Sequence, residues 1–409
     1  MSAWSNNRVL RVLRQYSLPL LSGVLAAVVL ANVDLGLYER ILHASPFGEG
    51  HPLSLHFLVN DVFMAFFFGI AAKEITESGL PGGALNPLKK AVNPLLGTLG
   101  GVLGPILVYK AYVAITGASA IANGWGIPTA TDIALAWLVA RIAFGEGHPA
   151  VSFLLLLAVA DDAIGLGIIA VFYPDPSHPV EPAWLGVVLG AMVVADQLRR
   201  RGVLSFWAYL LGPGVASWIG LYLGHLHPAL ALVPIVPLMP HAARDEGFYA
   251  EFADDVERTD TMNRFEHFFK LPVDLGLFFF GLANAGVPFS SVGPATWAVF
   301  LSLLLGKTIG VFTFSSIGRA VGFPLPTGMN SRSLFAAGLT AALGLTVALF
   351  VAGVAFTDGV LQGAAKMGAL GSAVIAPLAI LGARILRAQE VEASEGAARG
   401  GPEAIEGEA

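Results

Sequence analysis

The sequence contains no cysteine, and charged side chains are scarce. Without cysteine the chain has no disulfide, no thiol nucleophile and no cysteine-ligated metal. Asp, Glu, Lys and Arg make up only 13% of the 409 residues, whereas 55% are hydrophobic. A water-soluble domain carries about a quarter charged residues. Charge this sparse cannot cover a surface that faces water, so we predict a protein of the lipid bilayer, with no nucleic-acid partner.

Apolar segments recur along the chain and predict an all-α polytopic membrane protein. We count twelve, each a candidate for the roughly 20-residue apolar helix that spans a bilayer. They centre near residues 25, 66, 103, 133, 160, 191, 213, 233, 278, 307, 345 and 375. The transmembrane domain would cover 16–387, between a cytoplasmic N-terminal segment (1–15) and a disordered, acidic C-terminal tail (388–409).

Basic residues alternate between the two sides of this twelve-span arrangement. Cytoplasmic loops of membrane proteins are enriched in lysine and arginine. With both termini in the cytoplasm, only Arg40, Lys110 and Lys366 of the 23 basic residues fall outside, and Lys307 lies within a span. All other basic residues are then cytoplasmic. The distribution therefore predicts that both termini lie on the cytoplasmic side.

A loop at about 34–56 separates the first two apolar segments. Within it, the sequence LSLHF (53–57) alternates apolar and polar residues, a pattern compatible with a short external β-hairpin. An irregular loop containing Pro46 and Gly50 is the alternative.

Asp161 and Asp162 stand side by side in the apolar run 151–173. Moving one carboxylate into hydrocarbon is costly, and two together also repel each other, so something in the membrane must bind them. Neighbours on a helix diverge by roughly 100°, so one aspartate can face a cation path while the other meets a different helix. Lys307, flanked by apolar residues, is the candidate ion-pair partner. A salt bridge that merely holds helices together is the alternative.

Two apolar segments are interrupted by polar residues and helix breakers. The first interruption contains Pro128, Thr131 and Asp132, and the second contains Gly338, Gly344 and Thr346. Unpaired backbone at membrane depth is tolerated only beside protein or a water-filled cavity. Two broken helices in separate parts of the chain therefore suggest inverted repeats around a midplane site. Ordinary packing of helices through Gly and Thr is the alternative.

Cations and protons would compete for the buried carboxylates. Burial and repulsion favour the neutral, protonated form of a carboxylate, whereas a small hard cation prefers oxygen ligands. If the site faces only one side at a time, this competition becomes exchange.

Five stretches carry a family resemblance: TATDIALA (129–136), AVADDAIG (158–165), GLANAGV (281–287), LLGKTIG (304–310) and GLTVALFVAGVAF (344–356). In order and spacing the chain resembles the NhaA-type bacterial sodium–proton antiporters over nearly all of its span region. The resemblance implies an electrogenic antiporter of the bacterial inner membrane, often dimeric through an external hairpin. It would exchange cytoplasmic Na⁺ or Li⁺ for two external H⁺ in pH and sodium homeostasis and salt tolerance. It implies neither an enzymatic activity nor a cofactor.

The resemblance also implies residue roles. Asp162 would be the main carboxylate for Na⁺ and H⁺. Asp161 would pair with Lys307 and share in cation binding or proton release. Thr131 and Asp132 would lie where the two broken helices cross and would balance the partial charges of facing helix ends.

The residues tied to pH response in the family match only in part. After the second span the family often has a G-L-E-x-K-R-E pattern, whereas this chain reads FFFGIAAKEITESGL, with Lys73 and Glu74. The second part of the cluster is retained as Glu266, His267 and Lys270. We therefore predict a shifted or shallower pH profile.

Three other classes of protein are alternatives to this assignment. A sodium-coupled solute symporter is the strongest, because broken helices and cation sites occur there too, although no pocket for an organic substrate is evident. An intramembrane aspartyl protease would need a GxGD sequence, which is absent. A cation channel would need a continuous pore and usually symmetric subunits.

Overall fold

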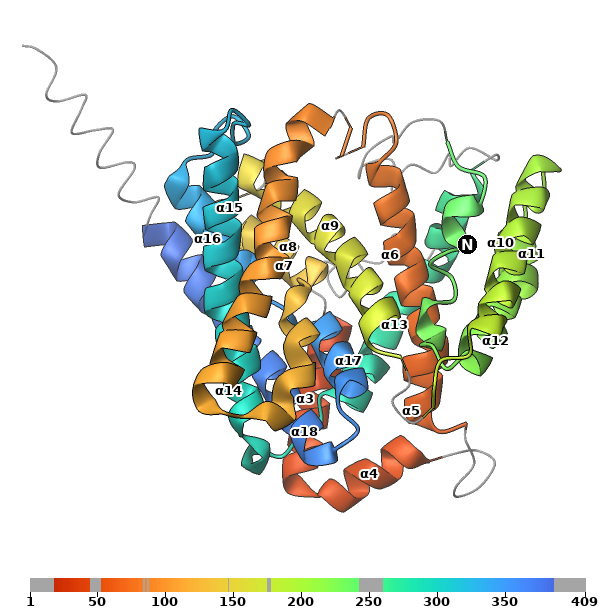
Figure 1. Cartoon of the computed structure of the whole chain (residues 1–409), viewed down its shortest axis with the longest axis horizontal. Coiled ribbons are helices and arrows are strands. Elements are labelled where there is room, and N and C mark those ends of the chain that lie inside the picture. Colours follow the sequence, from red (N-terminus) through yellow and green to blue (C-terminus); the bar gives the residue numbers. More distant parts are fainter. Residues whose placement is uncertain are drawn as a thin grey trace, which may run out of the picture.

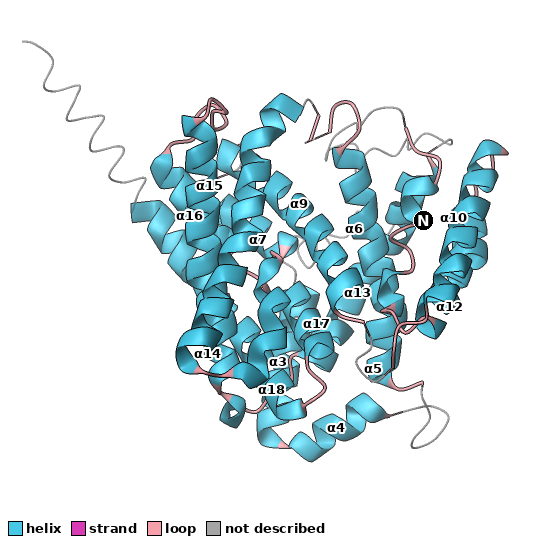
Figure 2. Cartoon of the chain, viewed as in Figure 1, coloured by secondary structure: helices cyan, strands magenta, loops and turns pink. Residues whose placement is uncertain are grey.

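The computed structural model describes residues 18–44, 53–83, 85–86, 88–145, 147–174, 178–242 and 260–385. The predicted N-terminal segment (1–15) and C-terminal tail (388–409) lie outside the described residues. Helices account for nearly all the regular structure, and the described part of the chain contains no strand (Figure 2). The all-α prediction is confirmed.

The helical elements follow the predicted apolar segments in order (Figure 1). They are α3 (Leu18–Val33), α4 (Leu35–His43), α5 (Leu55–Phe57), η1 (Leu58–Phe63), α6 (Met64–Ser78), α7 (Leu88–Thr116), η2 (Ser119–Thr129), α8 (Ile133–Phe144), α9 (Pro149–Phe172), η3 (Pro182–Trp184), α10 (Leu185–Arg200), α11 (Phe206–Tyr209), η4 (Leu210–Gly214), α12 (Val215–Leu223), η5 (Pro228–Leu230), η6 (Val236–Leu238), α13 (Thr261–Asn284), η8 (Phe289–Ser291), α14 (Pro294–Leu301), η9 (Ser302–Lys307), α15 (Thr308–Ala320), α16 (Ser331–Ala341), α17 (Leu345–Ala355), α18 (Gly359–Gly371) and η10 (Ser372–Val374).

Six continuous helices of the described chain are long and apolar enough to cross a bilayer. They are Leu55–Ser78, Ala91–Thr116, Pro149–Phe172, Phe206–Leu223, Pro294–Ala320 and Gly359–Ile385. Two bent pairs, η2 with α8 and α16 with α17, raise the number to eight. The count of twelve spans is therefore not confirmed, and the inverted repeat stays a prediction.

The remaining predicted spans are too short or too polar to count as membrane-spanning helices. Helices α3 and α10 have only 16 residues each, and α13 carries four charged residues over its 24. The segment near 233 holds only the short turns η5 and η6, because its prolines lack the N–H that a continuous helix needs.

The predicted β-hairpin is not found where the chain is described. Leu55–Phe57 is the first turn of the helix that continues into α6, and residues 45–52 lie outside the described part. Ser54 explains the helical start, because its hydroxyl accepts a hydrogen bond from the Phe57 N–H at 3.2 Å and caps the helix. Alternation over five residues was too short a pattern to outweigh this cap.

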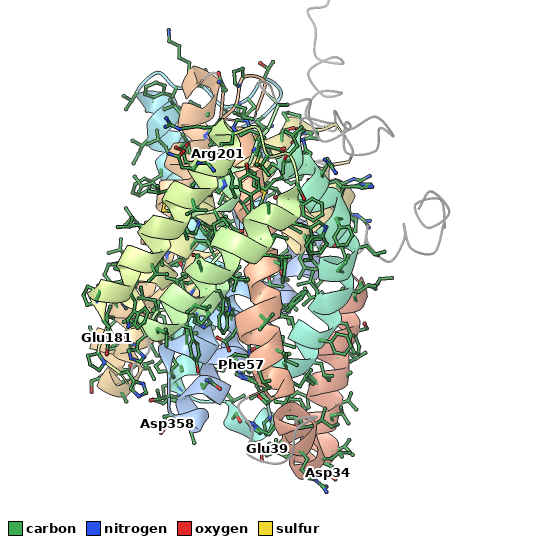
Figure 3. The ribbon with its side chains drawn as sticks, turned by 90° about the vertical axis from the view of Figure 1, so that its right-hand side faces the viewer. Asp34, Glu39, Phe57, Glu181, Arg201 and Asp358 are labelled. Atoms are coloured by element: carbon green, nitrogen blue, oxygen red, sulfur yellow. The ribbon has the colours of Figure 1, made fainter. Side chains whose placement is uncertain are left out.

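The two ends of the molecule differ in charge (Figure 3). Arg201 lies at one end, and Asp34, Glu39, Glu181 and Asp358 lie at the other. We call these ends the basic face and the acidic face. The continuous helix Leu55–Ser78 begins beside Phe57 at the acidic face, so the last turn of α6, at Ser78, lies toward the basic face.

Helices α7 and α15 pack side by side through glycines (Figure 1). A Cβ at Gly100 would collide with the backbone of Gly310, and one at Gly104 would collide with Gly306. Small residues allow this close approach of helix backbones in membranes. The contact fixes Lys307, which follows Gly306, at the centre of the bundle.

Candidate functional site

The two bent helix pairs meet at their breaks. The axis turns by 59° between η2 and α8, and by 45° between α16 and α17. At the meeting point the Asp132 N–H donates to the Leu343 carbonyl at 2.7 Å. Each break leaves backbone N–H and C=O groups without a partner in their own helix, and this hydrogen bond pairs one such group from each break. Polar backbone groups buried in a membrane need such partners.

Asp132 joins the starts of α8 and α17. Its Oδ1 accepts from the Leu135 N–H at 3.0 Å and caps α8, as aspartate at an N-cap commonly does. Its Oδ2 accepts from the Thr346 N–H at 3.1 Å, in the first turn of α17. A helix N-terminus carries a partial positive charge, so one buried carboxylate balances two such charges.

Asp161, Thr131 and Lys307 form a hydrogen-bonded cluster beside this crossing. Asp161 Oδ2 lies 2.7 Å from the Thr131 hydroxyl and 2.6 Å from Lys307 Nζ. The Thr131 hydroxyl also lies 3.0 Å from the Ala341 carbonyl, so its single proton can be donated to either oxygen. Lys307 Nζ also donates to the Thr129 carbonyl. The Asp161 and Lys307 side chains are completely buried.

A local distortion of the helix accompanies the position of Lys307. Residues Ser302–Lys307 form a π-helical turn, a feature that often occurs at functional sites. Gly101 on α7 faces the pair, since a Cβ there would lie 3.8 Å from both Asp161 Oδ1 and Lys307 Cε, at van der Waals distance. The ion pair is therefore enclosed by α7, α9 and α15.

Asp162 lies next to this cluster and has an oxygen that could bind a cation or a proton. Asp162 is 7% exposed, and one of its oxygens, Oδ1, has no hydrogen-bond partner within the described structure. Oδ1 of Asp161 has none either. The neighbouring carboxylates whose charge acts on Asp162 are those of Asp161, Glu74 and Asp132. Negative charge exceeds positive charge here, so the site suits a bound monovalent cation or protons.

Aspartate oxygens alone do not complete a cation site. Within the part of the chain that the structure describes, no three His, Cys, Asp or Glu side chains are arranged to hold a metal ion. A cation at Asp161 and Asp162 would also need carbonyl, hydroxyl or water oxygens, which hard cations accept.

Comparison with known proteins identifies the family. The sequence model described as Na+/H+ antiporter 1 matches residues 7–386. The chain is 57% identical to the Na(+)/H(+) antiporter NhaA of Geobacter metallireducens, over 93% of this chain and 99% of that protein. It shares 57% identity with the NhaA of Geobacter sulfurreducens over the same shares, and 54% with that of Desulfitobacterium hafniense over 95% and 98%.

The chain belongs to the NhaA family of Na⁺/H⁺ antiporters. It is a multi-pass membrane transporter, and Na⁺ and H⁺ are its transported ions. Membership of this family decides against the symporter, protease and channel alternatives.

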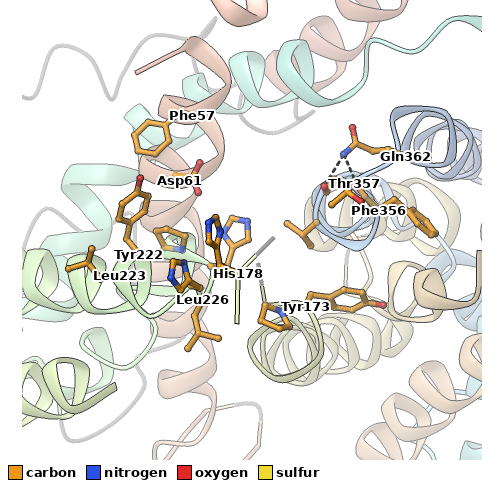
Figure 4. Close-up of a pocket in the computed structure, with 16 residues that line it drawn as sticks. Phe57, Asp61, Tyr173, His178, Tyr222, Leu223, Leu226, Phe356, Thr357 and Gln362 are labelled. Carbon is orange, nitrogen blue, oxygen red and sulfur yellow. Dashed lines mark hydrogen bonds between the residues drawn. The ribbon is translucent and has the colours of Figure 1, made fainter. Parts of the chain in front are cut away.

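The antiporter has a cavity of about 580 Å³ on its acidic face. Figure 4 shows Asp61, His178 and Tyr222 on one side of it, and Tyr173 and Phe356 on the other. Tyr173 directly follows α9, and Asp162 lies ten residues before the end of that helix. At 1.5 Å per residue the cavity and Asp162 are about 15 Å apart along α9.

A second group of charges lies toward the basic face, and we call it the quartet: the buried Lys73 and Glu266 and the partly exposed Glu77 and Lys270. Lys73 Nζ lies 2.5 Å from Glu77 Oε2 and 2.5 Å from Glu266 Oε2. Lys270 Nζ lies 2.8 Å from Glu266 Oε1. His267, predicted to belong to this group, is exposed and outside the quartet. The charge of Glu74, the neighbour of Lys73 in the sequence, acts on Asp162.

The other predicted residues of the broken helices lie at the crossing or beside it. Pro128 is buried in the last turn of η2. Gly338 packs against the backbone of Thr308, and Gly344 lies against the Ala130 carbonyl. The Thr129 carbonyl was missed from the sequence, since a backbone acceptor leaves no compositional signal.

Proposed function

We propose that this antiporter exchanges cytoplasmic Na⁺ or Li⁺ for external H⁺ by alternating access at Asp161 and Asp162. The observation that carries the proposal is the excess of buried negative charge around Lys307. One Asp162 oxygen and one Asp161 oxygen have no hydrogen-bond partner in the described structure, so each carboxylate can accept a proton or a cation. Since one site cannot hold both stably, Na⁺ binding displaces protons, and proton binding displaces Na⁺.

We assign two protons to each cycle. Asp162 releases one when Na⁺ binds. The second leaves from the Asp161–Lys307 pair, because a cation that recruits Asp161 withdraws the counter-charge that keeps the lysine charged. Exchange of one Na⁺ for two H⁺ moves net charge, so transport is electrogenic. Asp132 and Thr131 hold the crossing and orient Asp161.

We place the basic face in the cytoplasm of a bacterial inner membrane, with both termini on that side. Arg201, Arg319 and Arg332 at helix ends support this orientation, since cytoplasmic segments are rich in basic residues. The cavity on the acidic face then opens outward. We also propose a homodimer, formed through the 34–56 loop.

The deciding experiment is proton movement in sealed proteoliposomes that hold a pH gradient. Adding Na⁺ or Li⁺ to wild-type protein should release protons from the lumen, and Asp162→Asn should abolish this release. Asp196→Asn is the matched control, because Asp196 pairs with the exposed Arg200 far from the central site, and it should transport like wild type. Full activity of Asp162→Asn would overturn the assignment of the site.

The same assay, repeated from about pH 6.5 to about pH 9, tests the proposed shift or flattening of the pH profile. The balanced pairing of Lys73 and Lys270 with Glu77 and Glu266 supports that proposal, because fixed ion pairs resist titration. A steep rise of activity over the alkaline half of this range would contradict it.

A further inference from the structure

The cavity on the acidic face has an aromatic lining. Its volume of about 580 Å³ lies within the range that small-molecule sites occupy. The rings of Phe57, Tyr173, Tyr222 and Phe356 line it. Among the described residues that line it there is no lysine or arginine. Aromatic walls without basic side chains suit a ligand that is apolar, positively charged, or both.

Asp61 supplies a negative charge to this lining. Its side chain is partly buried, and within the described residues neither a hydrogen bond nor an ion pair reaches the carboxylate. Figure 4 shows Asp61 beside Phe57 and Tyr222. A partly buried carboxylate without a partner is costly, so a cation that enters the cavity would compensate it.

The two rings beside Asp61 are held in place by Trp218. The Trp218 ring stacks on Tyr222, with centroids 5.2 Å apart and planes at 7°, and meets Phe57 edge-on, at 6.1 Å and 87°. Its indole N–H donates to the Asp61 carbonyl at 2.8 Å. The face of an aromatic ring attracts a cation, and quaternary ammonium groups are recognised in this way. Rings that are already fixed lose little freedom when such a group binds.

The opposite wall has few polar groups free to bind a metal ion. The Tyr173 hydroxyl already makes two hydrogen bonds to backbone groups, each of 2.8 Å. The Gln362 amide donates to the Gly353 and Phe356 carbonyls. A hard cation needs several oxygen ligands at once. The cavity therefore suits a large, weakly hydrated cation better than it suits a metal ion.

The cavity also lies where two functional helices end. Tyr173 directly follows α9, which carries Asp162, and Phe356 directly follows α17, which begins at the crossing of the broken helices. A molecule in the cavity is thus in contact with the outer ends of both helices. Negative charge on the same face attracts cations toward this end of the molecule.

We infer that this cavity binds a quaternary ammonium cation of the size of choline, held by Asp61 and by the rings of Phe57 and Tyr222. The bound cation lies between the ends of α9 and α17, keeps them from moving relative to each other, and so slows ion exchange. The binding stands apart from the proposed function, whereas the effect on exchange rests on it.

Binding is tested by calorimetry on the full chain in detergent, at about pH 8, where an ordinary imidazole is neutral. The two probes are choline and the neutral alcohol of the same shape, in which carbon replaces the quaternary nitrogen. Choline should bind at least roughly tenfold more tightly than the alcohol, because only the cation is attracted by the carboxylate and the ring faces. Equal affinities, or no binding of choline, would overturn the site without the need for any variant.

Three variants locate the binding. Asp61→Asn should weaken choline binding roughly tenfold and leave the alcohol unaffected, since only the Coulomb attraction is lost. Tyr222→Leu keeps the charge and should weaken choline binding several-fold. Glu181→Gln is the matched control, because it removes a charge from the same face at a residue that does not line the cavity, and it should bind like wild type. A loss in Glu181→Gln equal to that in Asp61→Asn would show that the face as a whole attracts choline, and would overturn the site.

The effect on exchange is measured in vesicles of known orientation. Choline added outside right-side-out vesicles reaches the acidic face and should slow sodium-driven proton movement, each rate being compared with that of the same variant without choline. The slowing should be much weaker in Asp61→Asn. Equal wild-type rates with and without saturating choline would overturn the block.

Failure of this inference is distinguishable from failure of the proposed function, because calorimetry requires no ion exchange. If choline binds as expected while Asp162→Asn still transports, the cavity site stands and the assignment of the carboxylate site fails. If Asp162→Asn is inactive and choline binds no better than the neutral alcohol, the reverse holds.

Discussion

The central site and the quartet both bury a lysine beside carboxylates, but they differ in the balance of charge. In the central site one ammonium, that of Lys307, faces Asp161, with Asp162 and Asp132 nearby. In the quartet two lysines face two glutamates, and Glu266 gives one oxygen to each lysine.

This difference separates a binding site from a structural contact. A group of ion-paired charges that cancel gains little by binding an external ion, since a cation would have to displace a lysine. An imbalanced group lowers its energy by binding a cation or a proton. Uncompensated charge within the membrane therefore indicates an ion-binding site. Charges that compensate each other indicate a contact that holds helices together.

The largest effect on stability is expected from Lys307→Met. Removing one partner of a buried ion pair typically costs about 3–5 kcal/mol, because the remaining charge is left uncompensated. Thermal unfolding in detergent should show this loss. Adding Asp161→Asn should restore much of the stability, since the orphaned carboxylate is then neutral. A double variant no more stable than Lys307→Met would show that Lys307 acts through packing instead.

An intermediate effect is expected from Asp132→Ala. Each lost N-cap typically costs about 1 kcal/mol, so the loss of both helix starts should lower the free energy of unfolding by about 2 kcal/mol. Asp132→Asn keeps an acceptor for one of the two N–H groups and should fall between wild type and Asp132→Ala. The same thermal assay measures both. Identical losses for the two variants would mean that charge, rather than capping, is what Asp132 supplies.

The sequence predicted Lys307 as the partner of the aspartate pair because charges are so rare in the apolar segments that few combinations exist, and the family resemblance implied that Asp161 is the one that pairs. It also predicted both helix breaks, since Pro128 and Gly344 each lie beside polar residues within an apolar run. It could not predict the Thr129 carbonyl as a ligand of Lys307, because every residue has a carbonyl and only the fold selects one.

The number of spans was the weakest part of the sequence prediction. Apolar windows do not distinguish a full crossing from the short turns between Pro228 and Leu238, where prolines prevent a continuous helix. The alternation at 53–57 is not a strand for a similar reason, because the local cap at Ser54 outweighed it, and the rest of the predicted hairpin lies outside the described residues. Long-range charge pairing was the stronger signal here, since burying an unpaired charge costs more than any local preference.

The smallest effect should come from Lys270→Met, and it tests the comparison most sharply. Lys270 is partly exposed and reaches Glu266 within one helix, a kind of pair typically worth about 0.3–0.5 kcal/mol. Glu266 retains Lys73 in this variant, so no carboxylate is left bare. Stability in detergent should therefore change by less than about 1 kcal/mol, and sodium-driven proton release should match wild type. A large loss of stability or of proton release would mean that the quartet tolerates no net charge. The balance of all four charges, rather than the single ion pair between Lys73 and Glu266, would then keep α6 and α13 together.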